Sequence, residues 1–178
     1  MTTQTAEPTK SAIELSTGST TIADLLPKAA SKHGDWTAVK YKTAGDQWTT
    51  QTFQQAADRV AEIARGLIAL GIEHGDKVCI LADTRFEWTY AEFAIAQAGG
   101  VTVPIYPTNS PDECEWVVGN SEAKAIFCAD ASQLAKIRAV QDKLPSLEHC
   151  IVFDDGGELG DAITLSQLQA RASEVEQS

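Results

Sequence analysis

The sequence has few basic residues, and they do not gather anywhere. Lysine and arginine together number 14 against 25 aspartates and glutamates, which gives a net charge of −11 at pH 7. A nucleic-acid interface neutralises phosphates with a stripe of Lys and Arg, whereas the basic residues here are spread singly along the chain. We therefore expect no nucleic-acid partner. A nucleotide is not excluded, because backbone N–H groups and a few local cations can hold phosphates.

Long apolar runs and nucleotide-loop patterns are also missing. No segment approaches the roughly 18 apolar residues of a membrane span, and residues 1–10 have no apolar stretch of the kind found in a secretory leader. We therefore expect a cytoplasmic chain without a transmembrane segment. Neither G-x-G-x-x-G nor a Walker pattern occurs, so Gly71 and Gly75 are interpreted as a helix stop and a turn residue.

The four cysteines are far apart, and no two of them form a C-x-x-C pair. Three lie in apolar, strand-like runs, which favours small buried hydrophobes in a reducing compartment over a disulfide or a metal site. His33, His74 and His149 are equally isolated, and we assign them no ligand or general-base role. The sequence thus predicts no metal site and no catalytic residue.

Short apolar segments alternate with amphipathic ones over most of the chain. Residues 1–19 are polar and are expected to form a disordered tail, with one α/β unit over 20–178. Expected helices cover about 22–34, 53–70, 86–98, 111–121, 132–144 and 165–175, and expected strands lie near 36–41, 47–50, 77–81, 101–105, 123–128 and 149–153. The pattern predicts that the first two strands form a hairpin. The remaining alternation predicts a largely parallel sheet with helices on both faces.

Capping boxes mark the starts of three of these helices. A Ser or Thr at the N-cap is followed three residues later by Glu or Gln, which lets the two residues satisfy each other's free backbone N–H groups. The pairs are Thr52 with Gln55, Ser110 with Glu113, and Thr164 with Gln167. Pro111 occupies the first helical position after Ser110, where its missing N–H costs nothing.

The segment 99–111 joins a strand to one of these capped helices through a rigid turn. Val101, Val103 and Ile105 supply β-branched side chains for the strand. Pro104 and Pro107 each fix φ near about −65° and remove a backbone donor, which suits the exit of a strand from a sheet. This local structure occurs in most α/β proteins and by itself implies no chemistry.

Four motifs in order resemble the N-terminal region of the adenylate-forming superfamily, which includes acyl-CoA synthetases, luciferases and peptide-synthetase adenylation domains. Those enzymes show patterns like T-[YF]-x-E, L-x-x-x-G-[IV]-x-x-G-D-x-V, an N- or R-x-x-E-W helix start, and G-G/A-[VI]-x-V-P. The corresponding segments here are 52–55, 67–78, 85–88 and 99–111. The amino-acid sequences of segments 84–88 and 104–108 are most similar to those of the bacterial long-chain fatty-acid–CoA ligases.

The resemblance implies that residues 20–178 form an incomplete N-terminal subdomain of an AMP-binding domain. The complete enzyme would use ATP, Mg²⁺ and CoA to convert a fatty acid through an acyl-adenylate into acyl-CoA, with release of AMP and pyrophosphate. The family's phosphate loop, Y-T-S-G-T-[TS]-G-x-P-K-G, is absent from this sequence. The resemblance therefore implies that the missing C-terminal part carries the catalytic groups, and that this chain alone is inactive and binds no cofactor.

Two other functions are compatible with the same residues. One is a non-catalytic α/β scaffold or interaction module derived from this fold. The other is a related adenylate-forming enzyme that activates an aryl or amino acid. The residues of the acyl pocket would separate these enzymes, and they are not in the matched segments.

Candidate site residues follow from the open α/β fold, in which ligands bind at the carboxyl ends of the strands. Arg85 and Trp88 follow one expected strand, and Tyr106 and Thr108 follow another, so these four residues are candidates to face a substrate crevice. The structural alternatives are a core position for Trp88 and ordinary turn roles for the others. In some acyl-CoA synthetases a basic residue after the strand that corresponds to 125–128 helps hold the phosphates of CoA. By this resemblance Lys136 or Arg138 could fill that place, although a solvated helix face also explains both residues.

Overall fold

The structure, a computed structural model, describes residues 16–43 and 45–175. Its helices are α2 (Ile22–His33), α3 (Phe53–Ala69), α4 (Phe86–Gln97), α5 (Pro111–Ser121), α6 (Ala131–Arg138) and α7 (Leu165–Ala170), with 3-10 turns η1 (Gln141–Lys143) and η2 (Arg171–Glu174). Its strands are β1 (Thr37–Lys42), β2 (Trp48–Thr52), β3 (Lys77–Leu81), β4 (Val101–Ile105), β5 (Ala125–Cys128), β6 (His149–Val152) and β7 (Ile163–Thr164). None of the helices in these ranges is long and apolar enough to cross a membrane.

The expected tail lies outside the described residues as far as residue 15. Residues 16–19 lie against α2. Lys28 Nζ donates to the carbonyl oxygen of Gly18 at 2.9 Å, and Lys32 Nζ donates to that of Ser16 at 2.7 Å.

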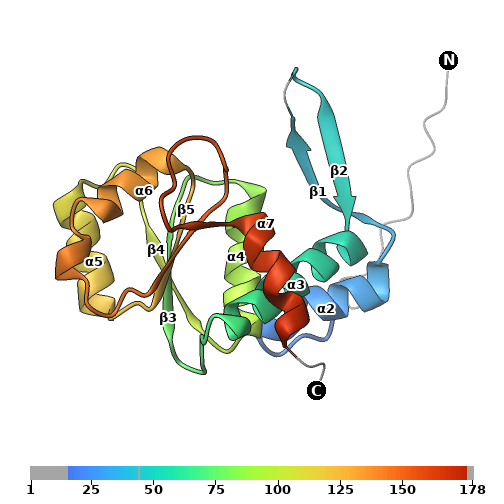
Figure 1. Cartoon of the computed structure of the whole chain (residues 1–178). Helices are drawn as coiled ribbons and strands as arrows, with labels where there is room; N and C mark the ends of the chain where they lie inside the picture. Colours follow the sequence, from blue (N-terminus) through green and yellow to red (C-terminus); the bar gives the residue numbers. More distant parts are fainter. Residues whose placement is uncertain (1–15, 44, 176–178) are drawn as a thin grey trace, which may run out of the picture.

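A five-stranded parallel sheet in the order β4-β3-β5-β6-β7 forms the centre of the molecule. Helices α5 and α6 lie on one side of the sheet, and α3, α4 and α7 lie on the other (Figure 1). The expected α/β class, with a parallel sheet covered on both faces, is confirmed. The antiparallel β1–β2 hairpin stands away from this body (Figure 1).

The two layers follow from the alternation of side chains along the central strands. In β3, Val78 and Ile80 enter the core with α3 and α4, whereas Cys79 and Leu81 enter the core with α5 and α6. All four are fully buried. Successive strand residues point to opposite faces, so a continuous apolar run such as this one requires helices on both sides.

The hairpin is tied to the body by a short chain of hydrogen-bonded polar groups, of which Gln51 and Tyr90 are buried. Tyr90 of α4 donates its hydroxyl to Gln51 Oε1 at 2.7 Å, and Gln51 Nε2 donates to the Tyr41 hydroxyl at 3.1 Å. The Tyr41 ring also contacts Phe86 at a centroid distance of 4.2 Å. Satisfied hydrogen bonds of this kind allow the amide of Gln51 to be buried at the base of the hairpin.

The helix ends agree with the capping signals in the sequence. All three expected capping boxes are present, and α2 has a fourth, between Thr21 and Asp24. Gly71 follows α3 with φ +86°, and Ile72 N–H donates back to the carbonyl oxygen of Leu67 at 3.1 Å. This is the Schellman geometry that a glycine at this position permits without steric cost.

Three elements differ from the expectation. The helix expected over 132–144 ends at Arg138, because Val140 leaves the helical conformation while its side chain stays in the core, and η1 follows. The helix expected over 165–175 is divided into α7 and η2. Strand β7 was not expected, since it has only two residues and Thr164 also serves as the cap of α7.

Strand β4 lies at the edge of the sheet and contains Pro104. Val101 N–H donates to the carbonyl oxygen of Asp76 at 2.8 Å, so residues 101, 103 and 105 direct their backbone groups toward β3. Pro104 then has its ring nitrogen on the outer edge, where no donor is needed for the β3–β4 ladder. This is the position in a sheet that tolerates proline.

Helices α3 and α7 approach closely at Gly66. A Cβ atom on Gly66 would lie 2.3 Å from the carbonyl oxygen of Leu168 and 2.9 Å from its Cγ. We expect Gly66→Ala to lower the free energy of unfolding by a net ~1–2 kcal/mol, because the strain of overpacking outweighs the gain in helix propensity. Urea denaturation measures this change.

Gly119→Ala in α5 is the matched control, since its Cβ would meet only Leu144 Cδ2, at 3.6 Å. This variant should be neutral or slightly stabilised. Equal stability of the Gly66→Ala chain and the parent would contradict the close contact between α3 and α7.

Candidate functional site

The carboxyl ends of the parallel strands meet along one edge of the sheet. The chain adds β4 on one side of β3 and then returns to place β5, β6 and β7 on the other side. In such doubly wound sheets the ligand crevice lies beyond the strand ends, at the point where the winding reverses. The loops that follow β3, β4, β5 and β6 are therefore the part of this fold to search for a site.

A hollow of about 430 Å³ lies at the ends of β3 and β4. Its walls are Ala82, Asp83, Thr84, Trp88, Pro104, Ile105, Tyr106 and Pro107. A volume of this size is within the usual range for a small-molecule site, and the mixture of aromatic, apolar and carboxylate groups is typical of one. The sequence-predicted residues Trp88 and Tyr106 both line the hollow, and Thr108 lies in the same turn as Tyr106.

Arg85 lies elsewhere, between the ends of β3 and β6. Its guanidinium donates two hydrogen bonds to the Asp154 carboxylate, at 2.7 and 2.8 Å, and its Nε donates to Glu87 at 2.7 Å. Asp154 follows β6 in the sequence, so this ion pair bridges the strand ends at the point where the winding reverses. Both carboxylates raise the pKa of Arg85, and the Arg85 hydrogen bond lowers the pKa of Asp154. A bidentate pair of this geometry fixes the loops that carry it.

Lys136 lies beneath the turn that contains Tyr106 and Thr108. Its ammonium donates to the carbonyl oxygen of Pro107 at 2.6 Å and to that of Asn109 at 2.9 Å. Arg138 lies at the other end of the sheet, in a separate hollow of about 320 Å³ beside His149. Its guanidinium is hydrogen-bonded to Gln141 at 2.5 Å and ion-paired with Asp161. Lys136 and Arg138 therefore belong to different places in the fold.

Sequence reasoning missed two carboxylates near this edge of the sheet. Asp83 lines the hollow, and Asp154 holds Arg85. Each stands within two residues of the end of an apolar strand, and that position was a usable signal. Within residues 16–43 and 45–175, no three His, Cys, Asp or Glu side chains are placed to hold a metal ion.

The four cysteines share one apolar layer. Cys79, Cys114, Cys128 and Cys150 are all buried and free, in the core between the sheet and helices α5 and α6. Burial raises the pKa of the Cys79 thiol to about 12 and also raises the pKa of the other three. At neutral pH these thiols are protonated, so they are packing groups rather than nucleophiles.

The strand order makes this a doubly wound α/β fold, a class in which ligands commonly bind at the carboxyl ends of the strands, where the hollow lies. Comparison with known proteins gives the family: a model of the AMP-binding enzyme family matches residues 26–177. The chain belongs to this family.

Curated relatives agree with this family. The chain is 36% identical over 134 residues to long-chain-fatty-acid–CoA ligase heimdall of Drosophila melanogaster, a match that covers 74% of this chain and 20% of that protein. It is 35% identical over 132 residues to long-chain-fatty-acid–CoA ligase FadD15 of Mycobacterium bovis, covering 70% of this chain and 22% of that one. The chain thus spans about a fifth of the length of the curated relatives it matches.

Solved structures show the same fold. A long-chain-fatty-acid–CoA ligase, FadD1, from Archaeoglobus fulgidus superposes with a TM-score of 0.73 at 23% identity, over 86% of this chain and 30% of that one.

The ion pair between Arg85 and Asp154 gives a test of the loop arrangement. We expect Arg85→Met to lower the free energy of unfolding by ~1 kcal/mol at pH 7, a value discounted for the partial exposure of Asp154. Folding depresses the pKa of Asp154, so its contribution is present above the unfolded pKa and is lost as pH falls through the folded value. The difference between the variant and the parent should therefore shrink below about pH 4.

Arg171→Met is the control, because Arg171 and Glu174 are exposed and 3.7 Å apart. Its stability should stay within ~0.5 kcal/mol of the parent. Denaturation curves at pH 7 and pH 3 that show the same loss for Arg85→Met would contradict an ionic contribution.

Proposed function

We propose that this chain is the N-terminal part of a long-chain fatty-acid–CoA ligase. The complete enzyme would join a fatty acid to CoA at the expense of ATP, through an acyl-adenylate, with release of AMP and pyrophosphate. The observation that carries the proposal is the family match over residues 26–177, together with ligase relatives at 35–36% identity. We place the enzyme in the cytoplasm, and we expect ATP, Mg²⁺ and CoA as its cofactors and co-substrates.

The described residues do not fit a magnesium–triphosphate site of their own. No carboxylate cluster in this part of the chain is placed to hold a metal ion. The ammonium of Lys136, close to the hollow, is already hydrogen-bonded to two backbone carbonyls. The proposal therefore assigns the groups that bind and activate ATP to polypeptide outside this chain, and the chain alone is expected to be inactive.

The role proposed for this part of the enzyme is to form one wall of the substrate crevice. Trp88, Tyr106 and Thr108 would face the ligand at the ends of β3 and β4, and Arg85 would hold the neighbouring loops in place. A contact of Lys136 or Arg138 with the phosphates of CoA stays a prediction. For Lys136 such a contact would require its ammonium to use its remaining donor or to leave the Pro107 and Asn109 carbonyls.

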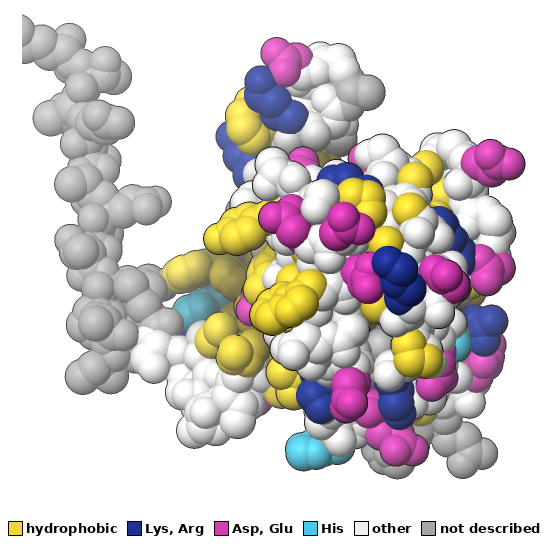
Figure 2. Space-filling view, turned by 90° about the vertical axis from the view of Figure 1, so that its left-hand side faces the viewer, with side chains coloured by type: hydrophobic (Ala, Val, Ile, Leu, Met, Phe, Trp, Pro, Cys, Tyr) yellow, Lys and Arg dark blue, Asp and Glu magenta, His cyan; other side chains and the backbone are white. Residues whose placement is uncertain are grey.

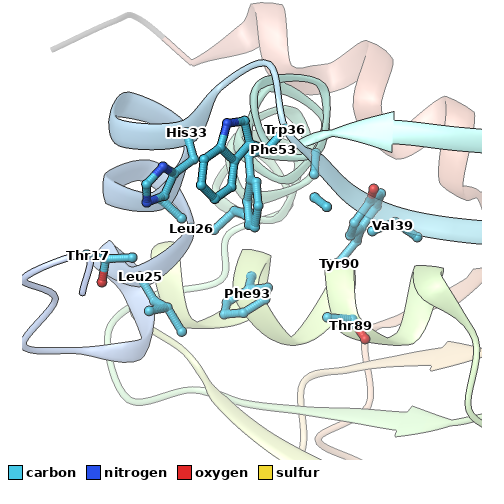
Figure 3. A pocket seen from close by; sticks show the side chains of 13 residues that line it. Thr17, Leu25, Leu26, His33, Trp36, Val39, Phe53, Thr89, Tyr90 and Phe93 are labelled. Atoms are coloured by element: carbon cyan, nitrogen blue, oxygen red, sulfur yellow. The ribbon is translucent and has the colours of Figure 1, made fainter. Parts of the chain in front are cut away.

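An apolar cavity supports the proposal that further polypeptide packs here. The cavity measures about 400 Å³ and lies between α2, the start of β1, the start of α3, and α4. Figure 3 shows Leu25, Trp36, Phe53 and Phe93 around it. Hydrophobic side chains also reach the surface below the projecting hairpin, on the left of Figure 2. Apolar surface of this kind marks an interface, and we propose that the missing C-terminal part covers it.

Pyrophosphate exchange tests the catalytic part of the proposal. The isolated chain should give no ATP–pyrophosphate exchange above background with palmitate or oleate, because it lacks the phosphate loop. A longer protein, expressed from the gene as it continues beyond the codon for Ser178, should give a palmitate-dependent exchange signal. Exchange by the isolated chain would overturn the assignment of catalysis to the missing part, and a stop codon after Ser178 would favour a non-catalytic scaffold.

Self-association of the isolated chain tests whether the apolar cavity is an interface. The isolated chain should gain mass with concentration in light scattering, and Leu25→Glu should suppress this, since Leu25 lines the cavity with 39% of its surface exposed. Ile68→Glu is the matched control, because Ile68 is 42% exposed but does not line the cavity. A parent chain that stays monomeric at high concentration would count against the interface.

A further inference from the structure

The turn after β4 carries two backbone carbonyls, those of Pro107 and Asn109, that have no partner in the sheet. Asn109 N–H donates to the carbonyl oxygen of Tyr106 at 3.0 Å, which closes a four-residue turn with Pro107 at its second position. Ile105 before the turn is buried, whereas the Tyr106 side chain is 78% exposed. The carbonyls of Pro107 and Asn109 lie beyond the last residue of β4 and take no part in the ladder with β3.

Side chains of α6 satisfy these carbonyls. Lys136 Nζ donates to Pro107 O at 2.6 Å and to Asn109 O at 2.9 Å, and Gln133 Nε2 donates to Pro107 O at 3.3 Å. An ammonium group has three donors and no acceptor, so it suits two carbonyls that converge on one point. Hydrogen bonds from a charged donor are also stronger than neutral ones.

Helix α6 is itself held firmly, so it can fix the turn in space. Asp130 caps its N-terminus by accepting from Ser132 N–H at 2.8 Å and Gln133 N–H at 3.0 Å. Leu134 and Ile137 bury its inner face in the core beneath the sheet. Lys136 therefore connects a fixed helix to the turn that carries Tyr106 on the wall of the hollow.

We propose that Lys136 is a positioning residue of the crevice. Its ammonium holds the 106–109 turn against α6 and thereby keeps Tyr106 at the hollow, on the wall shared with Trp88. Lys136 acts through the turn and does not touch the ligand. The claim about the turn stands on the geometry alone, and the claim that the turn serves ligand binding rests on the proposed function.

The first experiment measures the turn in the isolated chain. Lys136→Met keeps the apolar stem and removes all three donors. By NMR, the amide of Asn109 should exchange with solvent roughly tenfold faster, and the backbone N–H order parameters of Tyr106, Thr108 and Asn109 should fall from about 0.85 toward 0.6. Lys136→Arg, which retains donors and charge, should restore much of the protection.

Lys143→Met is the matched control. It removes the same charge from the 3-10 turn that follows α6, where Lys143 pairs with Glu115 at 2.8 Å. The exchange rate at Asn109 should not change. Equal exchange rates in Lys136→Met and the parent would overturn the proposal.

The second experiment measures the crevice in the full-length ligase that carries this segment. Lys136→Met should raise KM severalfold for one of ATP, palmitate and CoA, while kcat stays within about twofold and Lys143→Met resembles the parent. A loosened turn with all three KM values unchanged would overturn the positioning role. A raised KM for CoA without any loosening would instead mean that Lys136 contacts the ligand directly, which also overturns it.

The two experiments separate this inference from the proposed function. If the full-length parent protein has no ligase activity with any fatty acid, the proposed function fails. The exchange measurement on the isolated chain would still decide whether Lys136 holds the turn.

Discussion

Burial of the central strands on both faces is the constraint on which the rest of this structure depends. The three central strands, β3, β5 and β6, present apolar side chains to both layers, so α5 and α6 on one side and α3, α4 and α7 on the other are all required. The contribution of one buried aliphatic side chain, ~1.5–3 kcal/mol, exceeds that of a typical surface ion pair. The register of the sheet in turn brings the strand ends to a common edge, which is where the hollow lies.

Cationic side chains at this edge stabilise loops. Arg85 joins the ends of β3 and β6, and Lys136 joins α6 to the turn after β4. Both side chains donate hydrogen bonds to protein oxygens, and neither lines the hollow. The side chains that do line it include Asp83, Trp88 and Tyr106. This division suits the role proposed above, in which this part of the fold forms one wall of a crevice.

Local signals in the sequence predicted most of the fold. The capping boxes at Thr52, Ser110 and Thr164, and the stop at Gly71, follow from backbone chemistry within a few residues, and all are present. Strand β7 and the early end of α6 depend on packing partners distant in the chain, which periodicity does not reveal. The same limit applies at the carboxyl edge of the sheet. The order of the strands was enough to predict that Trp88 and Tyr106 lie at this edge. The partners of Arg85 and Lys136 lie 69 and 27–29 residues away in the sequence, where no local signal reveals them.

The proline in the edge strand has a consequence for assembly. A free strand edge is a template for repeated pairing between molecules, which leads to fibrils. Pro104 interrupts the donors along the outer edge of β4, so this edge offers an incomplete template. Growth by repeated addition of strands at the β4 edge should therefore be disfavoured.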